Sequence, residues 1–235
     1  MLRVDWSIVG ILVRKGIPMS AQMLVLSLSG VLMIALVNRF GVDTAAAFGA
    51  ALQIWNYIQM PAFAVGMAVS AMAAQNVGAG KWDRVRAIAR VGVVYSILLT
   101  GCTVVAIEIL DTHAFGLFLP AGSAALQIAG HLNRIATGSF VFFGISVVLF
   151  GVVRATGAVI APLVIFTVAL LGVRFPLAEA LLDKFQADAI WWSFPISSAL
   201  AAMLAALYYK FGGWRTTRMP SRVAGVGAPS TERSS

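Results

Sequence analysis

The sequence predicts an all-α, polytopic integral membrane protein with six transmembrane helices, and three observations support this fold class. First, 60% of the 235 residues are hydrophobic and 11% are charged, whereas soluble domains carry about 25% charged residues. Second, the mean hydropathy is +0.91. Third, the apolar residues form runs that reach the roughly 20 residues a helix needs to cross a bilayer core. Because so few charged residues cannot form a water-facing surface, we expect lipid to surround most of the chain.

The apolar runs define the individual elements. The second run is too long for one perpendicular crossing, so we expect a tilted helix that is kinked at Pro61 and ends before Gly78. The stretch 112–133 is also apolar, but Leu-Pro-Ala-Gly-Ser at 119–123 interrupts it. A seventh span there is the alternative. The six predicted spans are 16–38, 46–73, 88–109, 133–153, 157–176 and 189–211.

Two flanking segments complete the predicted organisation. Residues 1–15 combine basic and apolar side chains over too short a stretch to span, which indicates an amphipathic segment at the membrane interface. Residues 16–213 form the six-span lobe. Residues 214–235 are polar and rich in Gly, Pro and Ser, which is typical of a disordered tail.

Basic residues predict the orientation of the spans. Six crossings put both termini on one side, together with the loops between spans 2 and 3 and between spans 4 and 5. That side collects 13 of the 17 Lys and Arg residues, which by the positive-inside rule makes it cytoplasmic. The other side keeps Arg39, Arg134, Arg174 and Lys184 and takes six of the nine acids: Asp43, Glu108, Asp111, Glu179, Asp183 and Asp188.

The sequence offers little for catalysis or cofactor chemistry. No Asp or Glu falls in the middle of a predicted span, so this chain shows no obvious group for carrying a coupling ion. His113 and His131 lie outside the spans and have no partner at metal-ligand spacing, so no metal site or cofactor is expected. An intramembrane hydrolase built on Ser146 would lack a mid-membrane base. The basic residues that give the net charge of +8 lie between the apolar runs. This placement favours a role in membrane topology over nucleic-acid binding.

Uncharged polar residues are the remaining candidates. Gln53, Asn56 and Gln59 recur every three residues, which places them close to one face of a helix. An unpaired amide in lipid costs several kcal/mol, so this face meets either another helix or a wet cavity. Gln22 on the first span and the run from Ser139 to Ser146 on the fourth allow the same two interpretations. The candidate substrate-cavity lining is Gln22, Gln53, Asn56, Tyr57, Phe142 and Phe143.

The order of several short motifs resembles one family. RKGIPMSAQ opens the first span, and LVNRFG with AAAFGAALQ leads into the second. MPAFAVGMAVSAMAAQNVGAG ends that span, FGVVRATGAVIAP joins the fourth span to the fifth, and Gly-Trp follows the last span. In this order they resemble the carboxy-terminal six-helix lobe of the multidrug and toxic compound extrusion (MATE) family, from about residue 8 to residue 214.

The resemblance implies a bacterial-type inner-membrane exporter with both termini cytoplasmic. It would exchange amphipathic, often cationic compounds for Na⁺ or H⁺ at a cavity between two six-helix lobes. The second lobe would be a missing amino-terminal half, a partner chain or a second copy. The matching residues are expected to be mainly structural: Gly16, Pro18, Pro61, Gln75, Asn76, Gly78, Gly80, Arg154, Gly157 and Pro162.

Two features depart from the family pattern. Leu26 stands where some sodium-coupled members carry a glutamate, and the interior of the fourth span has no aspartate. The resemblance therefore assigns neither Na⁺ nor H⁺ to this lobe. A truncated, non-transporting membrane protein or a structural partner subunit remains the alternative function.

Overall fold

The computed structural model describes residues 6–216, and every regular element within that range is helical. Four long helices are α1 (Trp6–Val37), α2 (Val42–Gly78), α3 (Trp82–Ile109) and α9 (Ala187–Phe211). The short helices η1 (Asn38–Phe40), α4 (Asp111–Gly116) and η3 (Gly213–Thr216) lie at the ends of the bundle. α5 (Ala124–Ala136) and α6 (Ser139–Ala155) form a pair bent by 48°. α7 (Ile160–Phe166), the π-helix η2 (Thr167–Arg174) and α8 (Phe175–Phe185) run on as one helix.

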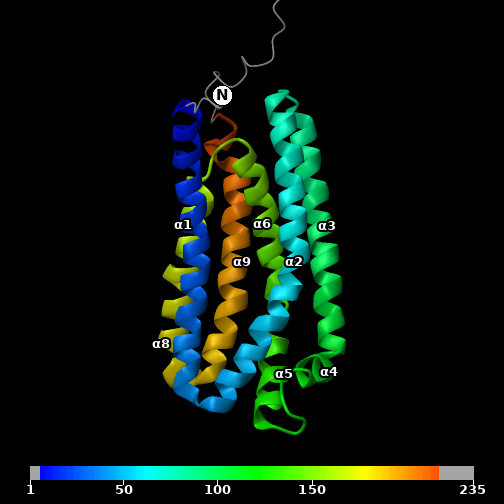
Figure 1. The fold of residues 1–235 in the computed structure, drawn as a ribbon, viewed down its shortest axis with the longest axis vertical. Helices are drawn as coiled ribbons and strands as arrows, with labels where there is room; N and C mark the ends of the chain where they lie inside the picture. Colours follow the sequence, from blue (N-terminus) through cyan, green and yellow to red (C-terminus); the bar gives the residue numbers. More distant parts are fainter. Residues whose placement is uncertain (1–5, 217–235) are drawn as a thin grey trace, which may run out of the picture.

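These elements confirm the predicted all-helical membrane fold. Five helices are long and apolar enough to cross a bilayer, and the bent pair of α5 and α6 makes a sixth span. The stretch 112–133 is not a seventh span, because α4 has six residues and α5 has 13. Figure 1 shows α1 beginning and α9 ending at the same end of the bundle, as an even number of crossings requires. We call this the upper end and the opposite one, with α4 and α5, the lower end.

Three predicted boundaries differ from the structure. Residues 6–15 are not a separate segment, because α1 runs unbroken through Pro18; a proline removes one hydrogen bond, whereas a break in lipid would leave several groups unpaired. The predicted disordered tail begins too early, because Trp214 is 1% exposed; residues 217–235 lie outside the described part of the chain. The fifth span ends at Phe185 and not at 176.

The longer fifth span corrects the placement of one charge. Arg174 was expected at the outer ends of the helices, among the interfacial charges, but it lies near the middle of the helix Ile160–Phe185. Its side chain contacts Ser197 and Ser198, which lie near the middle of α9. Arg174 is therefore an intramembrane arginine.

α6 is the centre of the bundle, packed against α2, α3 and α9. Small residues let these helices approach closely: a Cβ added to Gly151 of α6 would stand 2.7 Å from the carbonyl oxygen of Gly66 on α2. A Cβ added to Gly144 of α6 would stand at the same distance from the Ser96 hydroxyl oxygen of α3. Close approach of small residues gives van der Waals contact, which holds helices together where lipid supplies no hydrophobic driving force.

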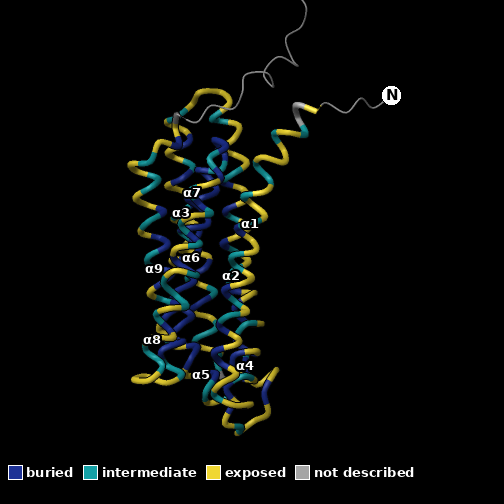
Figure 2. The backbone as a smooth tube through the Cα atoms, turned by 90° about the vertical axis from the view of Figure 1, so that its left-hand side faces the viewer, coloured by how far each residue is buried: buried dark blue, intermediate teal, exposed yellow. Residues whose placement is uncertain are grey.

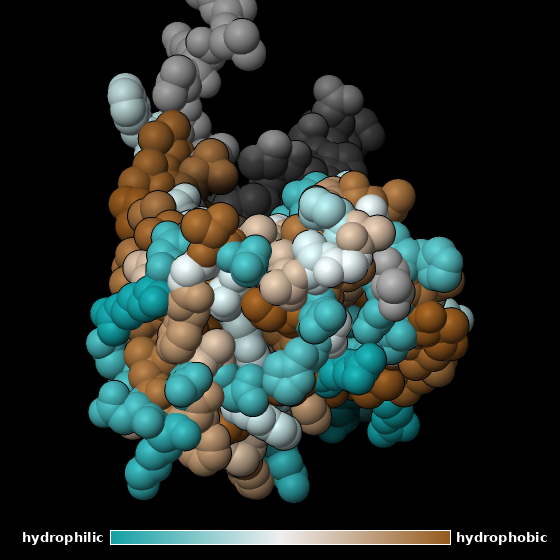
Figure 3. Space-filling view, turned by 90° about the horizontal axis from the view of Figure 1, so that it is seen from below, coloured by the Kyte–Doolittle hydropathy of each residue, from teal (hydrophilic) through white to brown (hydrophobic). Residues whose placement is uncertain are grey.

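The surface is arranged for a bilayer. Figure 2 shows exposed residues along the outward faces of the long helices and buried ones within the bundle. The lower end, seen in Figure 3, gathers hydrophilic residues, whereas hydrophobic ones cover the flanks. The same lower end carries the exposed ion pairs Arg39–Glu179 (3.3 Å) and His131–Asp188 (2.9 Å).

Candidate functional site

One face of α2 is polar and exposed. Gln53, Asn56 and Tyr57 are all exposed there, and the Gln53 Nε2 donates to the Tyr57 Oη at 3.4 Å. The Asn56 amide has no hydrogen-bond partner among residues 6–216. Gln59, the third amide of the stripe, donates to the Trp55 carbonyl of its own helix at 3.1 Å. The stripe therefore divides into an open part at 53–57 and a residue bonded to its own backbone.

One aromatic residue of α6 packs beside this face. Phe143 is 7% exposed, and its ring packs edge-on against Phe63 of α2, with centroids 5.7 Å apart. Phe143 also packs against Phe166 at 6.0 Å. Phe63 thus extends the α2 face, and Phe143 supports it from the core. Phe142 is 42% exposed, but it lies on the side of α6 opposite Gly151, which packs against α2.

Gln22 does not belong to this face. Its side chain is 3% exposed, and α1 packs mainly against α7 and η2. That Gln22 lines the substrate cavity therefore stays a prediction, and Gln22 is not counted in the open face. We define the open face as Gln53, Asn56, Tyr57 and Phe63 of α2.

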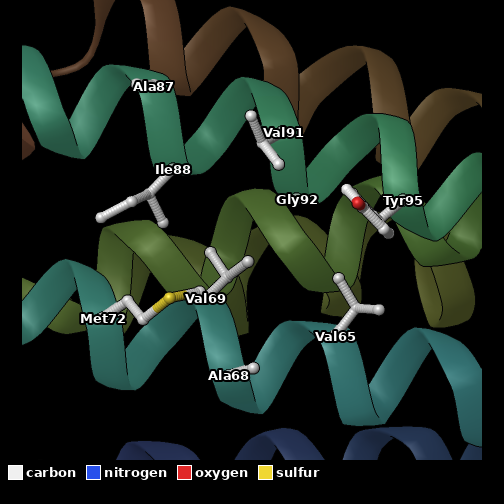
Figure 4. A pocket seen from close by; sticks show the side chains of 9 residues that line it. All are labelled: Val65, Ala68, Val69, Met72, Ala87, Ile88, Val91, Gly92 and Tyr95. Atoms are coloured by element: carbon white, nitrogen blue, oxygen red, sulfur yellow. The ribbon is translucent and has the colours of Figure 1, made fainter.

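A broad apolar pocket lies on another side of α2, facing α3 (Figure 4). Its volume is about 430 Å³, and Val65, Val69 and Met72 of α2 face Ile88 and Val91 of α3 across it. At 100° per residue these α2 positions lie roughly opposite Asn56 on the helix. The Tyr95 hydroxyl is the one polar side-chain group in its lining, so the pocket offers little to orient a polar ligand.

The family-signature residues lie at helix ends and within helices. Asn76 donates from Nδ2 to the Met72 carbonyl at 2.8 Å, and its own carbonyl accepts the Lys81 N–H at 2.9 Å. The carbonyl of Gln75 accepts the Ala79 N–H at 3.1 Å. Gly78 ends α2, and Gly80 turns the chain with a φ of 69° that disfavours other residues. These bonds fix the turn between α2 and α3.

The second signature fixes the turn before the fifth span. Gly157 has a φ of 86°, its N–H donates to the Arg154 carbonyl at 2.8 Å, and its carbonyl accepts from the Lys15 Nζ. Pro162 is buried in the first turn of α7, where its missing N–H costs little. Gly16 and Pro18 lie within α1 and Pro61 within α2. Figure 1 shows α2 changing direction along its length, as a proline in the helix permits.

A buried polar network at the lower end was missed by the sequence reasoning. The Trp55 Nε1 donates to the Asn133 Oδ1 at 3.4 Å and the Thr137 Oγ1 at 3.3 Å. Asn133 donates to the Glu108 Oε1 at 3.1 Å, and Thr137 donates to Asn133. The network sits where α5 breaks from α6, and it holds α2, α3 and α5 together. No spacing in the sequence connects these residues, which come from three separate helices.

The structure also shows the surroundings of the residues considered for catalysis and metal binding. The Ser146 hydroxyl is buried and donates to the Phe142 carbonyl of its own helix at 3.1 Å. Within the described range no group of three or more His, Cys, Asp or Glu residues is placed to hold a metal ion. The arrangement at the open face can bind and release a molecule by amide and ring contacts.

Comparisons with known proteins agree with the motif order. The MatE family model matches residues 18–179. The probable multidrug resistance protein YoeA of Bacillus subtilis (strain 168) is 34% identical over 212 residues, which are 89% of this chain and 46% of YoeA. YpnP, another probable multidrug resistance protein of that organism, is 30% identical over 91% of this chain and 48% of YpnP. The chain therefore spans about half the length of these relatives.

A solved structure shows the same fold. The crystal structure of a MATE protein in its bent conformation superposes with a TM-score of 0.80 at 18% identity. The match covers 94% of this chain and 49% of that one. Half of a MATE structure is one lobe, so the six spans described above correspond to one lobe of such a protein.

Proposed function

Because this chain belongs to the MatE family of multidrug transporters, we propose that it forms one lobe of an exporter of amphipathic compounds. A second six-helix lobe would lie across a cavity from the open face of α2. Rocking of the two lobes would open that cavity to each side of the membrane in turn. The second lobe would be an amino-terminal half of a longer chain, a partner chain or a second copy.

One observation carries this proposal: the open face is polar where lipid would demand apolar side chains. Asn56 has no partner within residues 6–216, and Gln53 bonds to the exposed Tyr57 alone. An unpaired amide in hydrocarbon costs several kcal/mol, so a second lobe, water or a ligand must meet this face. Phe63 adds ring surface for the apolar part of an amphipathic molecule, or for a cation over a ring.

The coupling ion would be bound outside this lobe. Leu26 is half-buried and apolar, and no acid lies in the interior of α6. A carboxylate is the usual carrier of a proton or sodium ion in a membrane pump. We therefore place the exchange of Na⁺ or H⁺ on the second lobe, with this lobe supplying a wall of the substrate cavity.

The proposed setting is a bacterial inner membrane with the upper end in the cytoplasm. Relatives from Bacillus subtilis favour such a membrane. With Arg174 within the span, three basic residues stay at the lower end, which are Arg39, Arg134 and Lys184. The 13 on the other side then favour the cytoplasm even more strongly.

Cysteine accessibility tests the cavity. Cys102 is free and exposed, so the background is Cys102→Ala. Asn56→Cys should react with a membrane-impermeant thiol reagent in intact vesicles. Two controls bracket it: Ile58→Cys, at a position 0% exposed, and Leu98→Cys, at a position 57% exposed on the apolar outside of α3. Both should stay unlabelled: Ile58 is packed inside the bundle, and at Leu98 the surrounding lipid suppresses the thiolate that would react.

Equal labelling of Asn56→Cys and Leu98→Cys would contradict a water-filled cavity. A non-transporting membrane protein is the second candidate, favoured by the lack of an acid at Leu26 and in the interior of α6. It predicts that cells expressing this chain accumulate ethidium as vector-only cells do. An exporter lobe with its partner present predicts lower accumulation, reversed by Asn56→Leu.

A further inference from the structure

Arg174 is a cation in the middle of the bundle. It lies near the centre of the helix Ile160–Phe185 and bonds to α9 near that helix's own centre. At 1.5 Å per residue, Ser197 lies about 15 Å from the start of α9, which is roughly half the thickness of a bilayer core. A charge at that depth is costly and rare in membrane helices, and there it usually serves a function.

The contacts of Arg174 are neutral. Its Nε donates to the Ser197 Oγ at 2.8 Å and its Nη2 to the Ser198 Oγ at 3.3 Å. The guanidinium carbon stands 4.5 Å from the centre of the Phe194 ring. None of the carboxylates between residues 6 and 216 forms an ion pair with Arg174. These contacts hold the guanidinium in place without neutralising its charge.

The guanidinium also keeps donors to spare. It has five N–H groups, of which two are used by the serine hydroxyls. A planar fork of N–H groups matches a carboxylate, which it binds through two parallel hydrogen bonds. Arg174 is half-buried, so part of the residue stays open at the surface of the lobe.

A second polar group nearby has no partner. The hydroxyl of Ser29 on α1 is buried, at 1% exposure, and forms no hydrogen bond in the described part of the chain. One turn further along α1, the Met33 sulfur accepts from the Ser193 hydroxyl of α9 at 4.0 Å. Toward the upper end, Ser197 lies one turn beyond Ser193 on α9, and Ser29 lies one turn beyond Met33 on α1. Ser29 is therefore at the same level of the bundle as Ser197 and Arg174.

The geometry points to a binding site for an anionic group, a carboxylate of an organic molecule, at Arg174 between α1, η2 and α9. The free guanidinium N–H groups would bind the carboxylate oxygens, and Ser29 would donate a further hydrogen bond. The Phe194 ring would cover one flat face of the guanidinium group. This site is separate from the open face of α2, and it would let the lobe accept amphipathic anions as well as neutral or cationic compounds.

Paired probes test the charge preference directly. The full chain in nanodiscs of zwitterionic lipid is titrated with pyrenebutyrate, and energy transfer from tryptophan is followed. Pyrenebutanol, which has the same ring system and no charge, is the matched probe. We expect Arg174→Gln to weaken the saturable binding of pyrenebutyrate about 10- to 100-fold, as loss of a charge-assisted hydrogen bond predicts. Pyrenebutanol binding should not change.

The controls separate a lost site from a lost fold. Arg39→Gln removes the same charge at a position whose side chain is 58% exposed, and it should bind pyrenebutyrate as the parent does. Should Arg174→Gln fail to fold, Ser29→Ala keeps the charge and should still weaken pyrenebutyrate binding several-fold without lowering the melting temperature by more than a few degrees. Equal affinity of the parent for both probes would overturn the site, as would unchanged pyrenebutyrate binding in Arg174→Gln. Binding is measured without transport, so this outcome is independent of the cavity test at Asn56.

Discussion

The contact between α6 and α2 gives the sharpest test of the packing. In Gly151→Ala, the new Cβ would stand 2.7 Å from the Gly66 carbonyl oxygen, whereas an ordinary contact begins at 3.4 Å. The two helices must separate by about 0.7 Å, because a backbone oxygen cannot rotate away as a side chain can. Overpacking of this kind costs about 1–3 kcal/mol. At about 2–4 °C per kcal/mol for a chain of this size, the melting temperature should fall by roughly 2–12 °C.

The matched control has the opposite sign. Gly101 lies inside α3, and a Cβ there meets nothing within 4 Å. Gly101→Ala should therefore raise the melting temperature slightly, since alanine is favoured over glycine within a helix by up to about 1 kcal/mol. Both variants and the parent are unfolded by heat in a mild detergent while tryptophan fluorescence is followed. A Gly151→Ala protein that melts at or above the parent would refute the close contact between α6 and α2.

Three further changes follow from the contacts. Asn133→Ala should lower stability by about 2–3 kcal/mol, because the buried Thr137 hydroxyl loses its acceptor and the Glu108 carboxylate loses a donor; thermal unfolding checks it against the exposed Gln127→Ala. Trp214→Ala should cost about 3–5 kcal/mol, since the ring is 1% exposed. Trp192→Ala, at a position 52% exposed on α9, should cost far less in the same assay. Arg39→Ala breaks an exposed ion pair and should shift stability by less than about 1 kcal/mol.

The spans could be predicted because a bilayer demands long apolar runs whatever their neighbours are. Five of the six runs became single long helices, and the fourth became part of the bent α5–α6 pair. The bend could not be read from the run, because it depends on Asn133 and Thr137 bonding to Trp55 of another helix. Hydropathy measures the solvent around a residue, and it carries no information on such partners.

The fifth span shows a different failure. The apolar run of the fifth span has its first charge at Arg174, and the span is predicted to end at 176. The structure instead continues the helix through Pro176, in the first turn of α8 directly after the π-helix η2. The proline removes one backbone N–H, and neighbouring groups in a helix bundle can re-satisfy the freed carbonyl. Arg174 was thus misplaced at the interface.

The candidate face was predicted in part for a similar reason. A spacing of three correctly grouped Gln53 with Asn56, because both share one side of a single helix. It could not show that Gln59 bonds to its own backbone, or that Gln22 is buried. Periodicity says which residues share a face. The neighbouring helices decide whether that face is open.

Two polar positions, Asn56 and Arg174, limit how this lobe can exist in a membrane. Each lies within a spanning helix. Asn56 has no hydrogen-bond partner among the described residues, and Arg174 bonds to two serine hydroxyls but to none of the described carboxylates. Leaving both against lipid would cost several kcal/mol, a large fraction of the 5–15 kcal/mol that stabilises a typical fold. In α6 the Ser146 hydroxyl bonds to its own backbone, whereas the Ser139 hydroxyl is buried without a partner among the described residues. Asn56 and Arg174 lie where a second wall, water or a ligand would relieve their cost, and this placement favours a transport lobe over an isolated membrane-embedded unit.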